Sequence, residues 1–164
     1  MSNATNRPAT VDEQARHTSG SRLVTAPANE IFALIANPHR HWEFDGSETV
    51  QRGIEGPTEL TLGDSFSMAM SFPLPVKALP YRVSSKVVEY EHGTRIAWAH
   101  FGKHRWRYEL QTVEGGTKVT ETFDWSSSIF PPVIAAVGYP ERHRSNIDAT
   151  LDRLAKLFDG DDAR

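Results

Sequence analysis

The chain contains no cysteine among its 164 residues. Disulfide bridges, thiolate metal sites and cysteine nucleophiles are therefore excluded, as is common for proteins of a reducing compartment. Long apolar runs are also missing, because no segment approaches the roughly 20 apolar residues that a membrane-spanning helix needs. The polar start, MSNATNRPATVDEQARHTSG, has no apolar signal-peptide core. We therefore expect a cytoplasmic protein without a membrane span.

A surplus of basic residues is missing as well. Lysine and arginine together number 18 against 21 aspartates and glutamates, which gives a net charge of −3. The most basic stretch is RIAWAHFGKHRWRYEL at 95–110, with four basic residues against a single glutamate. Binding of nucleic acid needs a surplus of basic groups on one face, so this stretch inside an acidic chain does not predict it. We expect no nucleic-acid partner.

Sequence motifs for covalent, nucleotide and metal chemistry are absent too. No serine lies in a G-x-S-x-G setting, and no glycine-rich loop of the phosphate-binding types is present. A metal site needs three or more ligands, which neither His39 and His41 nor His100 and His104 complete. His39 and His41 are instead expected in a solvated loop. The sequence thus predicts no cofactor and no metal, and leaves acid/base chemistry as the open catalytic mode.

Apolar spacing predicts one domain between two polar ends. Residues 1–12 are expected to form a disordered arm, residues 13–158 the domain, and residues 159–164 an acidic tail. Period-two alternation predicts strands at 13–26, 48–54, 64–72, 80–91, 94–101, 104–113 and 117–127. Helical spacing predicts a helix at 27–37, a turn or broken second helix at NPHRHWEFDG, and a long helix over 141–158.

This order of elements predicts an α+β fold. A meander of antiparallel strands must bury one of its faces, and only the long terminal helix is large enough to cover it. We therefore expect the terminal helix to lie across a curved sheet. The insert FPLPVKALP at 72–80 contains three prolines, which favours a loop or a flap at the edge of the sheet.

Several phrases along the chain match one known family in order and spacing. SRLVTAPANEIFALIANPHRHWEF resembles the opening of the polyketide cyclase/dehydrase-like branch of the START-like (SRPBCC) superfamily, and VVEYEHGTRIAWAH, YELQTVEGGTKVTETF and NIDATLDRLAKLF continue the resemblance over about residues 20–158. The resemblance implies a helix-grip fold: a curved antiparallel seven-stranded sheet wraps a long C-terminal helix, with two short helices after the first strand. It also implies a cavity for an apolar ligand, but no single reaction.

Strand alternation assigns the side chains of 95–125 to two faces. Arg105, Arg107 and Glu109 are expected to face water. A three-residue loop at 101–103 then brings the remaining side chains together on the inner face. The predicted inner rows are Ile96-Tyr108-Glu121, Trp98-Trp106-Phe123 and His100-His104-Trp125.

The inner rows contain the candidate functional side chains. Glu121 is an inward carboxylate with Tyr108 as its nearest predicted donor; a structural hydrogen bond, a ligand-orienting group and an acid/base with a raised pKa are all open interpretations. The acid/base candidates are Glu121, His100, His104 and Tyr108. Ligand contacts are predicted for Trp42, Phe66, Met68, Met70, Trp98, Trp106, Phe123, Trp125, Tyr139 and His143.

These expectations favour a monomer or homodimer that binds a hydrophobic, cyclic, polyketide-like or lipid-like molecule in an internal cavity. Whether the protein is a carrier, a sensor or an enzyme for cyclisation, dehydration or isomerisation stays open. The alternative is a protein-interaction module of the chaperone-cofactor type, which would lack a deep ligand cavity.

Overall fold

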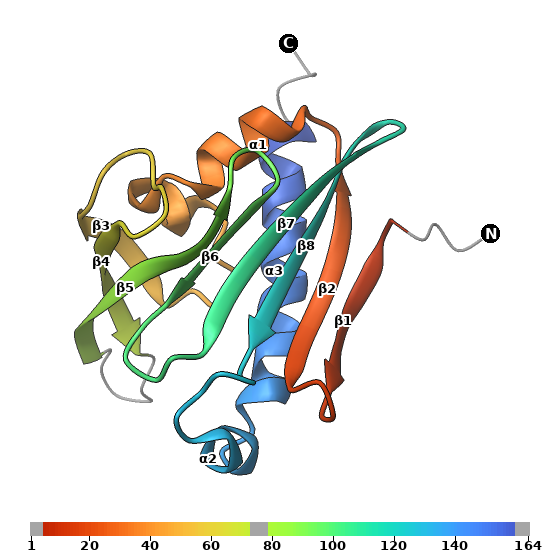
Figure 1. Cartoon of the computed structure of the whole chain (residues 1–164). Coiled ribbons are helices and arrows are strands. Elements are labelled where there is room, and N and C mark those ends of the chain that lie inside the picture. Colours follow the sequence, from red (N-terminus) through yellow and green to blue (C-terminus); the bar gives the residue numbers. More distant parts are fainter. Residues whose placement is uncertain (1–4, 73–78, 160–164) are drawn as a thin grey trace.

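Eight antiparallel strands form one curved sheet in the order β1-β2-β8-β7-β6-β5-β4-β3, with a long helix on its concave side (Figure 1). This computed structural model describes residues 5–72 and 79–159. The strands are β1 (Arg7–Asp12), β2 (His17–Val24), β3 (Val50–Glu55), β4 (Ser65–Phe72), β5 (Leu79–Glu91), β6 (Arg95–Ala99), β7 (Arg105–Val113) and β8 (Gly116–Asp124). The helices are α1 (Ala28–Ile35), the 3-10 helix η1 (Pro38–Glu43), α2 (Pro131–Ala136) and α3 (Tyr139–Asp159).

The predicted α+β helix-grip fold is confirmed, with one strand more than the seven expected. The additional strand is β1, which lies where a disordered arm is predicted for residues 1–12. Long-range contacts account for it: Asp148 Oδ1 on α3 accepts a hydrogen bond from Ala9 N at 2.7 Å, and Arg144 Nε donates to Ala9 O at 3.2 Å. Contacts between distant segments produce no apolar periodicity in the sequence of a short polar strand, so the sequence did not predict β1. Residues 1–4 and 160–164 lie outside the described residues.

The other elements lie close to their predicted positions. Each of the six strands after η1 begins and ends within three residues of its predicted bounds, and α3 begins two residues earlier than expected. Most of the proline-rich insert, residues 73–78, lies outside the described residues, and Leu79 and Pro80 already belong to β5.

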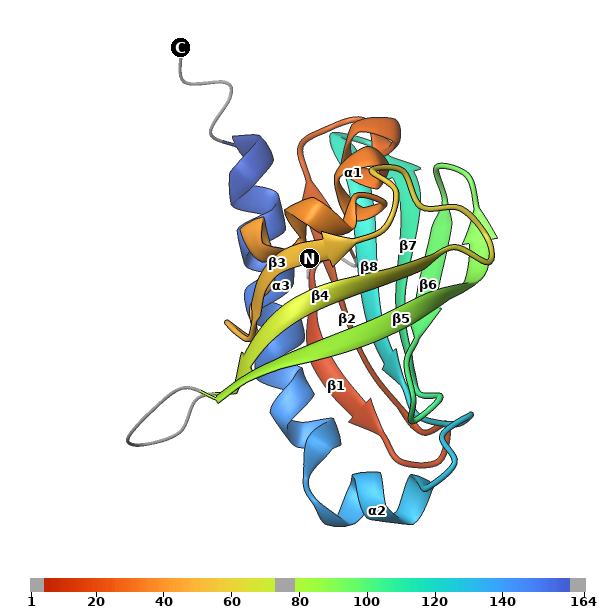
Figure 2. The same ribbon diagram turned by 90° about the vertical axis from the view of Figure 1, so that its left-hand side faces the viewer.

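Helix α3 covers only part of the sheet. It packs against β1, β2 and β8, where Ile147, Leu151 and Leu154 are almost fully buried. The half formed by β3, β4 and β5 curves away from this contact, as Figure 2 shows. The concave face over β4 to β7 therefore has to be closed by other elements, and this is where the candidate site lies.

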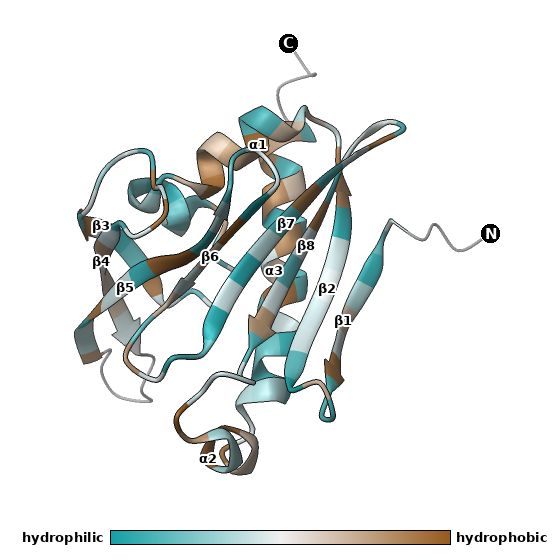
Figure 3. Cartoon of the chain, viewed as in Figure 1, coloured by the Kyte–Doolittle hydropathy of each residue, from teal (hydrophilic) through white to brown (hydrophobic). Residues whose placement is uncertain are grey.

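Side chains on the two faces of the sheet differ as the alternation predicts. Hydrophilic and hydrophobic residues alternate along β7 and β8 (Figure 3). On the outer face, Glu89 binds Arg105 at 2.8 Å and Arg107 at 2.7 Å, and Arg107 also reaches Asp124 at 3.1 Å. The arginines of the basic stretch are therefore neutralised on the outside of the sheet, which leaves its aromatic residues for the inside.

Candidate functional site

Pairing between β6, β7 and β8 matches the predicted register. The pairs are Ile96 with Tyr108, Trp98 with Trp106, Tyr108 with Glu121, Trp106 with Phe123 and Leu110 with Val119. The loop between β6 and β7 is closed by a hydrogen bond from Lys103 N to His100 O at 2.8 Å, with Lys103 in the left-handed region at φ 59°. This is the three-residue loop with a left-handed last residue that the register requires.

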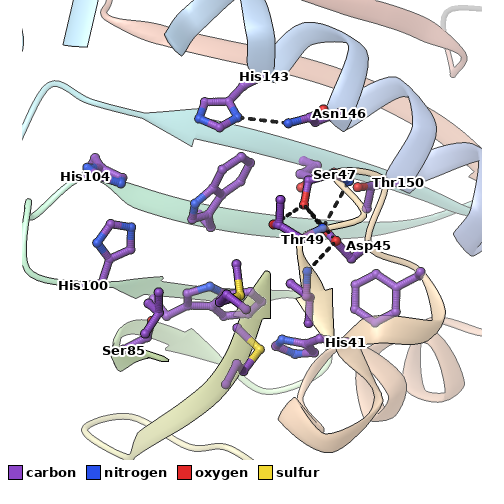
Figure 4. A pocket seen from close by; sticks show the side chains of 18 of the residues that line it. His41, Asp45, Ser47, Thr49, Ser85, His100, His104, His143, Asn146 and Thr150 are labelled. Carbon is purple, nitrogen blue, oxygen red and sulfur yellow. Dashed lines mark hydrogen bonds between the residues drawn. The ribbon is translucent and has the colours of Figure 1, made fainter. Parts of the chain in front are cut away.

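A pocket of about 380 Å³ lies on the concave face between the sheet, the segment from η1 to β3, and the start of α3 (Figure 4). Its volume falls within the range typical of small-molecule sites, about 300–1,000 Å³. Ten of the predicted site residues line it: Met68, Met70, Trp98, His100, His104, Trp106, Tyr108, Glu121, Tyr139 and His143.

Three predicted ligand contacts are core residues that do not line the pocket. Phe123 and Trp125 are at most 1% exposed; they belong to β8 and the residue that follows it, on the side of the sheet that α3 covers. Phe66 is 2% exposed and packs edge-on against Trp98, with ring centroids 5.7 Å apart. These side chains support the pocket wall from behind.

Trp42 also lies outside the pocket lining. Its side chain is 54% exposed, and its Nε1 donates a hydrogen bond to His39 O at 3.1 Å. In a 3-10 helix three residues make one turn, so neighbouring side chains point about 120° apart. The neighbour of Trp42 in η1, His41, takes the inward position instead.

His41 is a pocket residue that the sequence-based interpretation missed, since a solvated loop was expected there. It is 3% exposed, its Nε2 lies 2.8 Å from Ile35 O, and its ring stacks on Trp98 with centroids 4.9 Å apart. Burial lowers the pKa of His41 to about 4. The spacing of three that joins Pro38, His41 and Phe44, all buried, was the available signal for an inward 3-10 face.

Further lining residues come from elements whose role only the tertiary structure reveals. They are Phe44, Asp45, Ser47, Thr49, Val50, Tyr81, Val83, Ser85, Arg142, Asn146 and Thr150. The Asp45 carboxylate accepts hydrogen bonds from Ser47 Oγ at 2.8 Å and from Val50 N at 3.2 Å. Gly46 N donates to Thr150 Oγ1 at 2.9 Å, which fixes this loop to α3.

Glu121 is a deeply buried carboxyl group of the pocket, at 3% exposure. Its Oε1 accepts a hydrogen bond from the Tyr108 hydroxyl at 2.9 Å, while Oε2 has no partner among the described residues. Burial raises the pKa of Glu121 well above its usual value, and the charges of Asp45 and Asp148 raise it further. The hydrogen bond from Tyr108 opposes this shift, but the net increase in pKa favours the neutral form, in which Oε2 is able to donate a proton or a hydrogen bond.

The pKa values of three histidines at the other end of the pocket are lowered, whereas that of Glu121 is raised. Burial lowers the pKa of His104 to about 3 and that of His143 to about 4, and it also lowers the pKa of His100. These imidazoles are therefore neutral near pH 7. Within residues 5–72 and 79–159, no three histidine, aspartate or glutamate side chains are arranged to hold a metal ion.

The fold and the pocket agree with the result of a family comparison. The model of the family described as polyketide cyclase / dehydrase and lipid transport matches residues 15–159. The chain belongs to this family. The predicted resemblance is thereby confirmed, and membership supports a ligand-binding role without indicating a particular ligand or reaction.

The chain is similar to a protein of known sequence and to solved structures that have the same fold. The uncharacterized protein Rv0088 of Mycobacterium tuberculosis is 36% identical over 153 residues, which cover 90% of this chain and 66% of that protein. This chain thus spans slightly less than two thirds of the length of that relative. Protein NE0264 from Nitrosomonas europaea is 16% identical with a TM-score of 0.67, covering 94% and 100% of the two chains. The Aha1 dimer from Colwellia psychrerythraea is 12% identical with a TM-score of 0.58, covering 87% and 95%.

No helix within residues 5–72 and 79–159 is both long enough and apolar enough to cross a membrane.

Proposed function

We propose that the pocket binds a mostly apolar, cyclic small molecule whose polar group accepts a hydrogen bond from Glu121. The observation that carries the proposal is the buried carboxyl group of Glu121, whose Oε2 has no partner among the described residues, in a pocket of about 380 Å³. Tyr108 holds the other carboxyl oxygen, so Oε2 is oriented by the protein. Family membership supports the same role.

The pocket wall explains why the ligand should be apolar and flat. Trp98 and Trp106 are paired across β6 and β7, and Met68 and Met70 line the same space from β4. Aromatic rings offer large flat contact surfaces, and methionine side chains adapt to irregular ligands. A pocket of this size also argues against the alternative of an interaction module with a filled interior.

Filling the pocket should abolish binding. Ser85 on β5 lines the pocket, whereas its neighbour Ser84 is exposed and bonds to Ser67 Oγ at 2.9 Å on the opposite face. We expect α-tetralone, a neutral bicyclic ketone, to bind the unmodified protein with saturable quenching of tryptophan fluorescence. Ser85→Phe should weaken binding about tenfold or more, the equivalent of about 1.4 kcal/mol, because its ring occupies the ligand volume.

Ser84→Phe is the matched control, since it adds the same side chain to the outer face of the same strand. It should leave the affinity for α-tetralone within about twofold, a change of less than about 0.5 kcal/mol. Equal binding by the two variants, with both folded by circular dichroism, would show that the ligand does not occupy this pocket.

Proton-transfer catalysis is a second candidate function, favoured by the opposite pKa shifts in one pocket. Glu121 keeps its proton near neutral pH, while His100, His104 and His143 lack theirs. Separated pKa values of this kind are how enzymes assign acid and base roles. Glu121 would donate its proton to a ligand carbonyl, and water or an imidazole would accept the proton from the carbon beside that carbonyl.

Hydrogen exchange separates catalysis from binding alone. In deuterium oxide, a catalyst of this kind should accelerate exchange at the carbon beside the carbonyl of α-tetralone, measured by proton NMR. Glu121→Gln should slow the accelerated exchange by about 10²-fold or more, the usual contribution of a general acid. It should still bind the ketone, because the amide remains a hydrogen-bond donor. Unaccelerated exchange in the unmodified protein, with binding intact, would identify a carrier or sensor.

A further inference from the structure

One end of the pocket gathers three imidazoles and a guanidinium group. His100 is the residue before the loop that joins β6 and β7, and His104 is the residue after it. Arg142 and His143 lie near the start of α3. The rings of His100 and His104 are 4.1 Å apart, and the Phe123 ring lies 5.2 Å from His104 and 4.3 Å from His143. Figure 4 shows the three imidazoles at the same end of the pocket. We call His100, His104, Arg142 and His143 the histidine end.

The polar groups of the histidine end have few partners. His104 Nδ1 is buried without a hydrogen bond from or to any described residue. His143 Nδ1 has only a long contact of 3.5 Å with Asn146 Nδ2. Among residues 5–72 and 79–159, none of the ion pairs includes Arg142, whose guanidinium lies over the ring of Tyr139 at 5.5 Å. These groups therefore have hydrogen-bonding capacity that the described part of the protein does not use.

The opposite end of the pocket is acidic. Asp45 lies there, with the hydroxyl groups of Ser47 and Thr49 beside it (Figure 4), and its charge contributes to the raised pKa of Glu121. Tyr108, which binds Glu121, lies four positions after His104 along the chain, or roughly 13 Å at the usual strand rise. The two tryptophans fill the distance between the ends. Among the described lining residues, the pocket is therefore polarised along its length, with the unpaired guanidinium of Arg142 at one end.

We propose that the ligand carries an anionic oxygen group, such as a carboxylate or an ionised enol, which binds at the histidine end. This inference rests on the proposed function, because it assumes that the apolar body of the ligand lies against Trp98 and Trp106. Arg142 supplies the positive charge, and each neutral imidazole supplies one N–H donor. An anion at the other end would face Asp45, so the arrangement also fixes the direction in which the ligand binds.

The test compares two probes of nearly the same shape, α-naphthoate and its neutral amide α-naphthamide, by calorimetric titration. The unmodified protein should bind the carboxylate about tenfold more tightly, since a hydrogen bond to a charged group is worth about 1.4 kcal/mol more than one to a neutral group. Arg142→Met should reduce this preference, measured as the ratio of the two affinities, to about twofold, because it removes the charge that distinguishes the probes. His100→Phe keeps a ring beside His104 and should also lower the preference.

Lys156→Met is the matched control, because it removes one positive charge from an exposed position on the same helix, remote from the pocket. It should keep the full preference for the carboxylate. Equal affinity of the unmodified protein for the two probes would overturn the inference and leave the proposed function standing. Binding of neither probe, nor of α-tetralone, would instead count against the proposed function itself. A preference that Lys156→Met lowers as much as Arg142→Met would also overturn the inference, since the overall charge would then be the cause.

Discussion

Glu121→Gln should make the protein more stable than the unmodified chain at alkaline pH. Folding raises the pKa of Glu121, so the folded state keeps a proton that the unfolded state has lost. The contribution of this group to stability is therefore complete below the unfolded pKa of about 4.3 and decreases as pH rises towards the folded pKa. Glutamine keeps the hydrogen bond from Tyr108 and has no proton to lose. We expect the free energy of unfolding of the variant to exceed that of the unmodified protein by about 1 kcal/mol or more at alkaline pH, because only the unmodified protein must keep or lose a buried proton.

The measurement is urea unfolding followed by tryptophan fluorescence. It is made at about pH 4, where the contribution of Glu121 to the free energy of unfolding is present, and at about pH 8, where it is reduced. The two proteins should be nearly equal at the lower pH and differ at the higher one. The lowered pKa values of the buried histidines affect both proteins equally and cancel in the difference. Glu109→Gln, on the exposed side of the same hairpin, should change stability by less than about 0.5 kcal/mol at either pH. A variant less stable than the unmodified protein at alkaline pH would show that Glu121 is ionised in the folded state.

Gly46→Ala should lower the free energy of unfolding by about 2–3 kcal/mol, the usual cost of forcing extra atoms into a packed contact. A Cβ atom at Gly46 would lie 2.4 Å from Thr150 N and 2.5 Å from Asn146 O. Both are backbone atoms of α3, so no side-chain rotation relieves the overlap. The loop that carries Asp45 must instead move away from the helix, and urea unfolding at neutral pH measures the cost.

The same substitution should weaken ligand binding, because Asp45, Asn146 and Thr150 line the pocket. Gly63→Ala is the matched control. It introduces the same methyl group into open space at a positive φ of 89°, so it carries only the left-handed backbone cost of about 1–2 kcal/mol. It should leave the affinity for α-tetralone unchanged. If Gly46→Ala were as stable as the unmodified protein, the close approach of this loop to α3 would be wrong.

The position of the pocket follows from the incomplete cover that α3 gives the sheet. The helix seals the face of β1, β2 and β8, and the aromatic residues beneath it, Phe123 and Trp125, are core. From β7 onwards the sheet curves away, and side chains of the same inward register, Trp106 on β7 and Trp98 on β6, become pocket lining. Identical strand alternation thus produces core on one half of the sheet and pocket lining on the other.

The sequence by itself determined the sheet faces and the register of β6, β7 and β8. Alternation sends charged and apolar residues to opposite faces, and a one-residue slip would expose the tryptophans, so a single pairing fits. That is why the pairs Trp98-Trp106 and Tyr108-Glu121 were predictable. The family resemblance supplied the helix-grip arrangement.

The tertiary structure decided which inward residues line the pocket and which other residues join them. Strand β1 depends on hydrogen bonds from Ala9 to α3, and the inward turn of His41 on packing against Trp98. The position of His143 at the same end of the pocket as His100 and His104 depends on where α3 begins relative to the β6-β7 loop. Each of these is a contact between segments far apart in the chain. Local periodicity reports the environment of one element at a time, so it contains no record of such contacts.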